Sequence, residues 1–488
     1  MRRRWSDEGD ELQTAGFQGV SAWDPFASPM AGMLRRPHIR PIFELDMRGA
    51  GCSPRVPAAS SAHHLFDGMP HTSRAEKSSK SCNEDRISAL PDDVLHHVLG
   101  FLPADEAVHT SLLAKRWHYL WKSMRRLRIN EMGRWGPPRF LHSSAAAGGV
   151  FLTKFVSCLL LLRDPDSTLD EVEIKYDHHF EDDLTWISTW IHHALSCQTQ
   201  VLTVKFPLPV YVPRYLDGPP LVSRYLRRLE ISKGRLKSNF LNFSSCSTLE
   251  DLKIKDCDLD ASSILSQSVK HLSIKDCFFK DDVRINISVP NLVLLQLKSC
   301  GGRTPFLESM LSLETAVVSS EIWSVDYCHK GFFAGECCGT CLDCCGNDGL
   351  KGGCVLLGGL SRAKNLELIA HPGMFIFKRD LRWCPTFSKL KTLLLNEWCV
   401  QPDLRALVCM LEHSPVLENL TLQLHKQEKP TCSVEVEENA RLMEKPEAIS
   451  GYLKIIKVKC EEIDGRVCKV LNFLSTFGIE ITIQRTKG

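Results

Sequence analysis

One pattern of apolar and polar positions recurs through most of the chain, in the form apolar-x-x-apolar-x-apolar. The alternation in its last three positions is typical of a short strand with one buried face. The polar stretch after each strand, often containing Asp or Cys, predicts a turn that reverses the chain. The pattern occurs at Leu169/Val172/Ile174, Val201/Val204/Phe206, Leu226/Leu229/Ile231, Leu249/Leu252/Ile254, Val269/Leu272/Ile274, Leu292/Leu295/Leu297, Leu313/Ala316/Val318, Ala363/Leu366/Leu368, Leu390/Leu393/Leu395 and Leu417/Leu420/Leu422.

The spacing of these triplets predicts a solenoid. Between residues 226 and 313 the mean step is about 22 residues, within the range of leucine-rich repeats, roughly 20–29 residues. One unit cannot bury its own apolar face, so neighbouring units should stack and their strands should form a parallel sheet. Longer steps, such as the one from 313 to 363, indicate loop insertions. An unrelated α/β domain with fortuitous Leu triplets is the alternative.

A second pattern, over residues 90–121, predicts three short helices. Pro91 suits the first helical position because its missing N–H is not needed there, and Asp92 and Asp93 follow at the positive end of the helix dipole. Pro103 should end this first helix. A segment of about 40 residues buries only a modest share of its surface, so we expect a partner to cover its large apolar side chains. These are Val94, Leu95, Val98, Leu99 and Leu102 on the first helix, Val108 and Leu112 on the second, and Trp117, Leu120 and Trp121 on the third.

This segment resembles an F-box. The resemblance is carried by Leu90-Pro91, Val94-Leu95, Leu99, Leu102-Pro103, Val108 and the ending from Lys115-Arg116-Trp117 to Leu120-Trp121. In that family the module docks on the Skp-type adaptor of a cullin-RING ubiquitin ligase, which implies the adaptor and, through it, a cullin as partners. An ordinary three-helix core segment is the alternative interpretation. The adaptor-binding residues that the resemblance implies are Leu90, Pro91, Val94, Leu95, Leu99, Leu102, Val108, Leu112, Trp117 and Trp121.

The C-terminal run, residues 452–483, predicts a strand, a helix and a second strand. Leu453/Ile456/Val458 repeats the strand triplet once more. The helix carrying Val467, Val470, Leu471 and Leu474 is expected to cover the end of the array. An F-box, degenerate leucine-rich repeats and this ending together resemble plant F-box/leucine-rich-repeat proteins that close with an FBD region. The resemblance implies an α/β fold with an N-terminal three-helix F-box, a leucine-rich-repeat solenoid with a parallel sheet, and a C-terminal cap.

The domain organisation follows from these patterns. Residues 1–84 are rich in Pro, Gly, Ser and Arg without a sustained period of 2 or 3.6, which predicts a disordered leader. The other predicted parts are the F-box at 85–125, the repeats at 126–440 with a Cys-rich insertion at about 319–362, and the FBD-like cap at 441–488.

Composition narrows the partners and the compartment. The 488 residues contain 60 Lys and Arg against 58 Asp and Glu, a formal charge of +2, which lacks the strong basic field of a dedicated nucleic-acid binder. No apolar stretch approaches the ~20 residues that span a bilayer, and residues 1–30 lack the apolar region of a signal peptide. We therefore expect no nucleic-acid or membrane partner, a cytoplasmic or nuclear location, and reduced thiols for the 21 cysteines.

The insertion between the repeats holds candidate zinc ligands. Its run Cys337-Cys338-Gly-Thr-Cys341-Leu-Asp-Cys344-Cys345 contains overlapping C-x2-C spacings, which make Cys338, Cys341 and Cys344 candidate thiolate ligands. A structural site normally pairs two separated knuckles, whereas these share Cys341. We therefore predict a surface loop with reduced thiols and no metal or other cofactor. A redox-sensing cluster is a third possibility, although no neighbouring Lys, Arg or helix start would depress a thiol pKa.

The sequence contains no phosphate-binding loop, nucleophile elbow or H-E-x-x-H pair. We therefore predict that the chain is not an enzyme but the substrate-recognition subunit of an SCF-type ubiquitin ligase. The F-box would dock the adaptor, and the repeats would hold an unknown target protein close to the site of ubiquitin transfer. The alternatives are a scaffold that binds the adaptor without delivering substrate, and a zinc-dependent nucleic-acid or redox protein using the cysteine loop.

Overall fold

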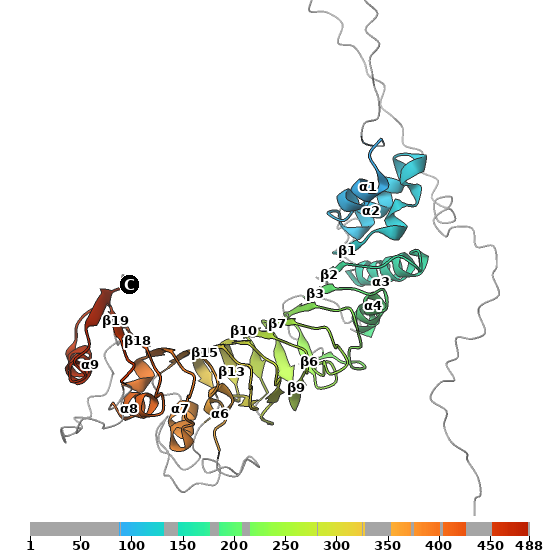
Figure 1. The fold of residues 1–488 in the computed structure, drawn as a ribbon. Helices are drawn as coiled ribbons and strands as arrows, with labels where there is room; N and C mark the ends of the chain where they lie inside the picture. The colour runs from blue at the N-terminus through green and yellow to red at the C-terminus, as the bar shows by residue number, and fades with distance from the viewer. Residues whose placement is uncertain are drawn as a thin grey trace, which may run out of the picture. The chain divides into compact units, whose positions relative to one another are not determined.

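A computed structural model shows a mixed α/β unit built on a long parallel sheet (Figure 1). The chain divides into two compact units, Met1–Cys82 and Asn83–Gly488, and the described residues all belong to the second. The predicted leader, 1–84, lies outside them. The described residues are 87, 89–130, 145–175, 185–206, 215–280, 282–324, 326, 353–371, 375–400, 404–425 and 451–486.

The first helix begins after Pro91 and ends before Pro103, as predicted, and a second helix begins after Pro103. Pro91 precedes α1 (Asp92–Leu99) and Pro103 precedes α2 (Ala104–His109). The rest of the segment forms short 3-10 turns instead of further regular helix. The extended backbone of Ala114 separates the first of these turns from the second, and Tyr119 separates the second from the third. The turns are η2 (Thr110–Leu112), η3 (Lys115–His118) and η4 (Leu120–Ser123).

The long ladder of the sheet contains one strand from each repeat, and every strand is parallel to the next. The second and third positions of successive triplets pair in register, for example Leu229 with Leu252 and Leu252 with Leu272. Such a sheet is compatible with the predicted leucine-rich-repeat solenoid. In order, the strands are β1 (Arg126–Ile129), β2 (Glu171–Lys175), β3 (Val201–Lys205), β5 (Arg228–Ser232), β7 (Asp251–Lys255), β10 (His271–Lys275), β13 (Leu294–Gly302), β15 (Thr315–Ser324), β16 (Asn365–Ala370), β17 (Thr392–Asn396), β18 (Asn419–Leu424), β19 (Ile455–Cys460) and β20 (Ile481–Arg485).

One predicted triplet has the wrong register. Strand β3 pairs Leu202 with Val172 and Val204 with Ile174, so the repeat uses Thr199/Leu202/Val204 in place of Val201/Val204/Phe206. Thr199 is completely buried, and its hydroxyl donates to the Ala194 carbonyl at 2.6 Å. A buried polar group whose hydrogen bond is satisfied locally costs little, so threonine replaces the expected apolar residue.

The middle repeats turn back through two further rows of short strands. The corner residues Lys233, Asp256 and Asp276, directly after β5, β7 and β10, and Ser299 within β13 adopt positive φ angles of 51° to 63°. The second row joins the end of β13, and the third is a separate sheet. The second row is β4 (Tyr215–Leu216), β6 (Arg235–Lys237), β8 (Asp258–Asp260) and β11 (Phe278–Phe279), and the third is β9 (Ser263–Leu265), β12 (Asn286–Ser288) and β14 (Phe306–Leu307).

The cysteines beside these corners are structural thiols. Cys257, Cys277 and Cys300 direct their thiols at carbonyls of the preceding repeat, Ile231, Ile254 and Ile274, at 3.6 to 3.8 Å. The cysteines of the described residues are all free.

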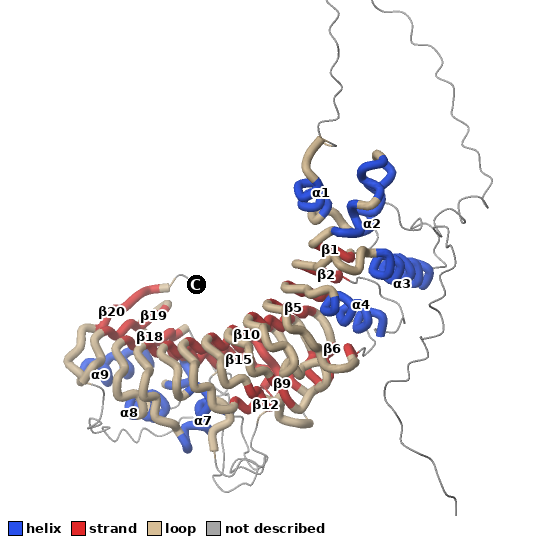
Figure 2. The backbone as a smooth tube through the Cα atoms, turned by 45° about the vertical axis from the view of Figure 1, so that its right-hand side comes forward, coloured by secondary structure: helices blue, strands red, loops and turns tan. Residues whose placement is uncertain are grey.

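Helices replace the short strands toward both ends of the array (Figure 2). They lie on the side of the long ladder that the second and third strand rows occupy in the middle. None of the described helices is long and apolar enough to cross a membrane. The helices and turns are α3 (Ala145–Leu162), α4 (Thr185–Ser196), α6 (Leu357–Leu360), α7 (Phe375–Asp380), η5 (Leu381–Trp383), η6 (Glu397–Cys399), α8 (Arg405–Glu412) and α9 (Gly465–Ser475).

The C-terminal residues form the expected strand, helix and strand. Asp464 caps α9 by accepting hydrogen bonds from the backbone N–H groups of Arg466 and Val467 at 3.0 and 2.9 Å. The helix buries Val467, Val470 and Leu474. Strand β20 follows and pairs with β19, and most of its side chains are exposed. The capping role of this region stays a prediction.

Deleting residues 440–488 tests that role. The truncation removes β19, the outer partner of β18, and uncovers Leu420 and Leu422. Because a repeat array is stabilised mainly by contacts between neighbours, we expect faster amide exchange in β18 and β17 and unchanged exchange in β5 and β7. Hydrogen-exchange mass spectrometry measures this. Unchanged protection at residues 419–424 would rule out a cap.

Candidate adaptor-binding surface

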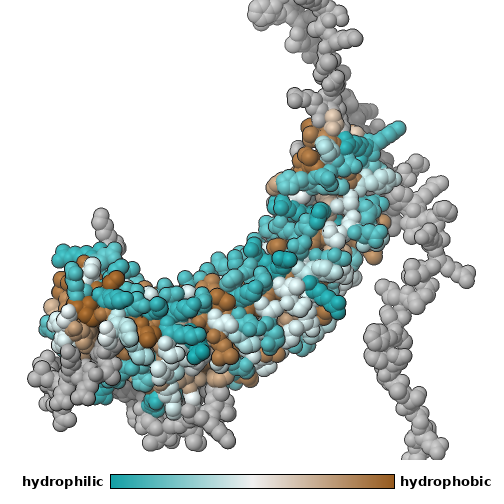
Figure 3. Space-filling view, in the orientation of Figure 1, coloured by the Kyte–Doolittle hydropathy of each residue, from teal (hydrophilic) through white to brown (hydrophobic). Residues whose placement is uncertain are grey.

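Helix α1 has two apolar faces. Leu95 and Leu99 are completely buried beneath it. Val94 and Val98 are 41% and 43% exposed, and Phe101, just beyond the helix, is 54% exposed. The i, i+4, i+7 spacing of these three residues places them along one side of the helix. We call Val94, Val98 and Phe101 the α1 stripe. Figure 3 shows apolar side chains at the surface of the N-terminal helices.

Further apolar side chains are exposed in the turns after α2. Leu112 and Leu113 are 80% and 70% exposed, and Tyr119 is also exposed. Of the exposed group, Phe101, Leu113 and Tyr119 were not predicted to face a partner, and Val98 was expected to be covered by one but was not among the predicted adaptor-binding residues. The spacing of Val98 and Phe101 from Val94 is the signal in the sequence that identifies two of them.

The segment buries more of itself than its size suggested. Leu95, Leu99, Trp117 and Trp121 are each less than 10% exposed, so the expectation that a partner must cover them is wrong. They belong to a core that continues into Met124 and β1. The expectation from segment size treated residues 90–121 as isolated and so left out this neighbouring core. Of the other predicted adaptor-binding residues, Leu90, Leu102 and Val108 are half-buried, and Pro91, Val94 and Leu112 are exposed.

Polar contacts hold α1 against the turns that follow it. Asp92 at the start of the helix pairs with Arg116 of η3 at 2.6 Å. On the next turn, the His96 ring nitrogen Nε2 lies 3.0 Å from the hydroxyl of Ser123, the last residue of η4. The exposed Asp92–Arg116 pair contributes little to stability, less than about 1 kcal/mol, but together the two contacts orient the α1 stripe relative to η3 and η4.

The helical segment is joined directly to the solenoid. Strand β1 leaves η4 after Met124 and pairs with β2, and Arg126 lies 3.5 Å from Glu171 across that pair. Arg163 at the end of α3 is buried and donates to the Met124 carbonyl at 2.8 Å. Burial lowers the pKa of this arginine. The junction is therefore a packed continuation of the sheet, which fixes the orientation of the α1 stripe relative to the first repeats.

The F-box domain family matches residues 87–129, which span α1, α2, the three turns and β1. This segment is an F-box domain. Its match ends at the last residue of β1, so the F-box includes the strand that begins the solenoid sheet.

Relatives extend the similarity beyond the F-box. The F-box/FBD/LRR-repeat protein At5g22700 of Arabidopsis thaliana is 26% identical over 424 residues, covering 79% of this chain and 87% of the relative. The F-box/FBD/LRR-repeat protein At5g22660 of the same plant is 26% identical over 380 residues, covering 70% and 77%. The MEIOTIC F-BOX protein MOF of Oryza sativa subsp. japonica is 28% identical over 359 residues, covering 69% and 71%. The predicted resemblance to plant F-box/leucine-rich-repeat proteins with an FBD region is confirmed.

The solvent-facing side of the long ladder carries a row of lysines beyond the F-box. Lys255 of β7, Lys275 of β10 and Lys298 of β13 occupy the same register position on three adjacent strands. Lys255 lies 3.7 Å from Asp256, whereas Lys275 and Lys298 have no acidic partner within 4 Å among the described residues. Neighbouring strands are about 4.8 Å apart, and like charges directly opposite one another are destabilising. This lysine row therefore favours an anionic partner.

The predicted candidate zinc ligands Cys338, Cys341 and Cys344 lie outside the described residues. Within them, a different group of metal-binding side chains comes together: Cys384, Cys409 and His413. The side-chain interaction with Cys384 lowers the pKa of the Cys409 thiol to about 7, and the same interaction raises the pKa of Cys384.

Proposed function

We propose that this chain is the substrate-recognition subunit of an SCF-type ubiquitin ligase. The supporting observation is an F-box domain joined through β1 to a long parallel sheet with a solvent-facing side. The F-box docks a Skp-type adaptor, which connects the chain to a cullin, and the repeats bind a target protein. The chain performs no chemistry itself. It holds the target near the site of transfer, which converts a bimolecular step into an effectively unimolecular one.

The exposed residues of the F-box make the adaptor contacts in this proposal. The α1 stripe supplies one set of anchors, and Pro91 and Leu112 extend it. Half-buried Leu90, Leu102 and Val108 contribute at the rim. The remaining predicted residues, Leu95, Leu99, Trp117 and Trp121, hold the shape of the surface from below.

Charge complementarity indicates the kind of target. The lysine row presents positive charge at steps of about 4.8 Å, which suits an extended acidic segment of a target protein. Nearer the F-box, Lys175 and Lys205 occupy the same register position, but both pair with Glu173 at 2.9 and 3.6 Å. Among the register-matched lysines from β2 to β13, Lys275 and Lys298 therefore carry the charge that no described acidic side chain pairs within 4 Å.

Reversing Lys275 and Lys298 to glutamate should lower the capture of target proteins at least tenfold and leave adaptor binding unchanged. The matched control is Lys389→Glu with Lys469→Glu, which makes the same change in net charge at exposed positions off the strand face. Quantitative mass spectrometry of captured proteins gives the readout. Equal loss in both double variants would show that net charge, and not the lysine row, determines capture.

Co-purification distinguishes the proposed function from the scaffold alternative. The full chain, captured from cells treated with a proteasome inhibitor, should bring down the adaptor, a cullin and ubiquitin-modified proteins together. Recovery of the adaptor without a cullin would contradict substrate delivery and favour a scaffold.

A further inference from the structure

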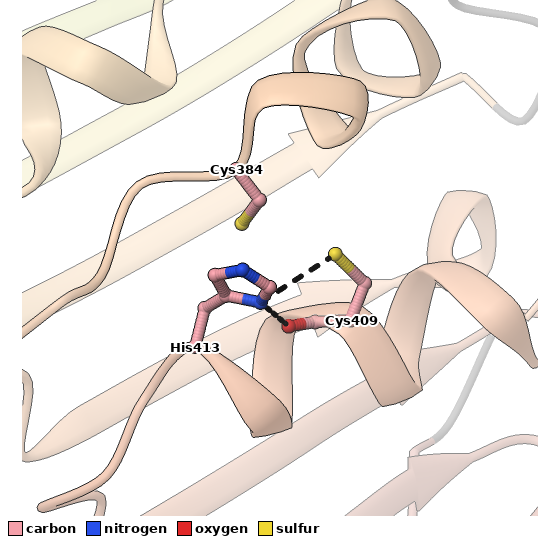
Figure 4. Close-up of side chains that lie close together, drawn as sticks. All are labelled: Cys384, Cys409 and His413. Atoms are coloured by element: carbon pink, nitrogen blue, oxygen red, sulfur yellow. Dashed lines mark hydrogen bonds between the residues drawn. The ribbon is translucent and has the colours of Figure 1, made fainter.

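We propose that Cys384, Cys409 and His413 form a zinc-binding site in the C-terminal half of the solenoid. Their two sulfur atoms and one imidazole nitrogen all lie within 4.8 Å of one another (Figure 4). Two thiolates and an imidazole are ligands that zinc prefers. This inference is independent of the F-box and of the proposed function.

The fold itself brings the three ligands together. Cys409 lies on α8 and His413 caps its end, so the two side chains are one helical turn apart on the same face. Cys384 comes from the preceding repeat, directly after η5. The connection that carries it is held in place because the Phe387 N–H donates to the His413 carbonyl at 2.7 Å. The ligand arrangement is thus positioned by backbone contacts before a metal binds.

The hydrogen bonding of His413 prepares it for a metal. Its Nδ1 lies 2.9 Å from the Cys409 carbonyl, which can only accept, so Nδ1 carries the proton. The lone pair is then on Nε2, the ring nitrogen that points toward the Cys384 sulfur in Figure 4. Metal-binding histidines usually donate their other N–H to a carbonyl or carboxylate in this way. The Cys409 sulfur lies 3.8 Å from Nδ1, beside the same ring.

Three protein ligands leave one position of tetrahedral zinc for water. All three side chains are partly exposed, so solvent and metal reach the site. A bound zinc would link the connection after η5 to α8, and therefore join two successive repeats.

Titration of the purified full chain with Co²⁺, a spectroscopic substitute for zinc, tests the site. We expect one equivalent to bind with thiolate-to-cobalt charge-transfer absorption and the visible bands of a tetrahedral site, and zinc to displace it. Cys384→Ser and Cys409→Ser should each weaken binding by more than about 100-fold, since even second-shell changes cost 10–100-fold. His413→Asn should weaken it similarly. Cys468→Ser, at an exposed thiol on α9, is the matched control.

The cysteines of the 337–345 run need their own control. The triple variant Cys338→Ser, Cys341→Ser and Cys344→Ser should retain the cobalt spectrum. Loss of the spectrum in this variant but not in Cys409→Ser would assign the metal to the run and overturn the proposal.

A last measurement avoids dependence on variant folding. Zinc should raise the unfolding temperature of the wild-type chain, and chelator should reverse the rise. Absence of any bound metal, or a Cys384–Cys409 disulfide found by peptide mapping of freshly purified, unreduced protein, would contradict a zinc site.

Discussion

Replacing Val98 and Phe101 by alanine should weaken the binding of a Skp-type adaptor by at least about 30-fold. Truncating one large apolar anchor at a protein interface costs about 2 kcal/mol or more, which corresponds to about 30-fold in Kd, and this single-anchor value is the lower bound because such contributions are not additive. Both side chains are exposed on the α1 stripe, so their truncation leaves no cavity in the core. Titration calorimetry of the purified chain with the adaptor measures the change.

Two further variants separate adaptor binding from folding. Leu161→Ala removes an exposed leucine from α3, outside the F-box, and should leave the Kd unchanged. Leu95→Ala removes a buried side chain and should lower the free energy of unfolding by about 2–5 kcal/mol. Undiminished binding by the Val98/Phe101 variant would show that the adaptor does not use the α1 stripe.

Replacing Asp380 by alanine should destabilise the C-terminal half of the solenoid by about 3–5 kcal/mol. This carboxylate is completely buried and accepts hydrogen bonds from the N–H groups of Val355, Leu356 and Leu357 at 2.9, 2.7 and 3.0 Å. It also pairs with buried Arg379 at 3.1 Å. Its removal would leave the arginine buried without its charge partner and the start of α6 without acceptors.

The matched control is Asp251→Ala. Asp251 pairs with Arg228 and His271 at the protein surface, and such pairs contribute less than about 1 kcal/mol. Denaturant unfolding, together with hydrogen exchange around α6 and α7, should distinguish the two. Equal stability of both variants would mean that the buried Arg379–Asp380 pair does not stabilise these repeats more than a surface pair does.

The repeats were readable in the sequence because each strand carries its own signal. Alternation at Leu252 and Ile254, for example, directly reports the buried face of β7. The position of Thr199 could not be predicted in this way. Its burial is tolerable because its hydroxyl donates to the Ala194 carbonyl, and no pattern of apolar residues reveals that hydrogen bond. The type of helix in the N-terminal segment was harder to predict, because 3-10 turns and α-helices have nearly the same spacing of apolar positions over four residues.

The candidate sites depended more on tertiary contacts. Val94, Leu95, Val98 and Leu99 are all apolar, so the sequence of α1 does not show which side faces the core and which faces solvent. That choice is made by the packing of η4 and β1. In the zinc-binding cluster, the spacing Cys409-x3-His413 is visible on one helix. Cys384 joins it only because successive repeats stack, which local spacing does not show.

The most direct test of the central claim is ubiquitin transfer in a reconstituted reaction containing the chain, the adaptor, the cullin-RING core and a target captured by the solenoid. The wild-type chain should support transfer to the target. The Val98/Phe101 variant should still bind the target but should support little transfer, because only its connection to the ligase is lost. Equal transfer with both chains, or none with the wild type when target and adaptor are both bound, would contradict a substrate receptor that works through this F-box surface.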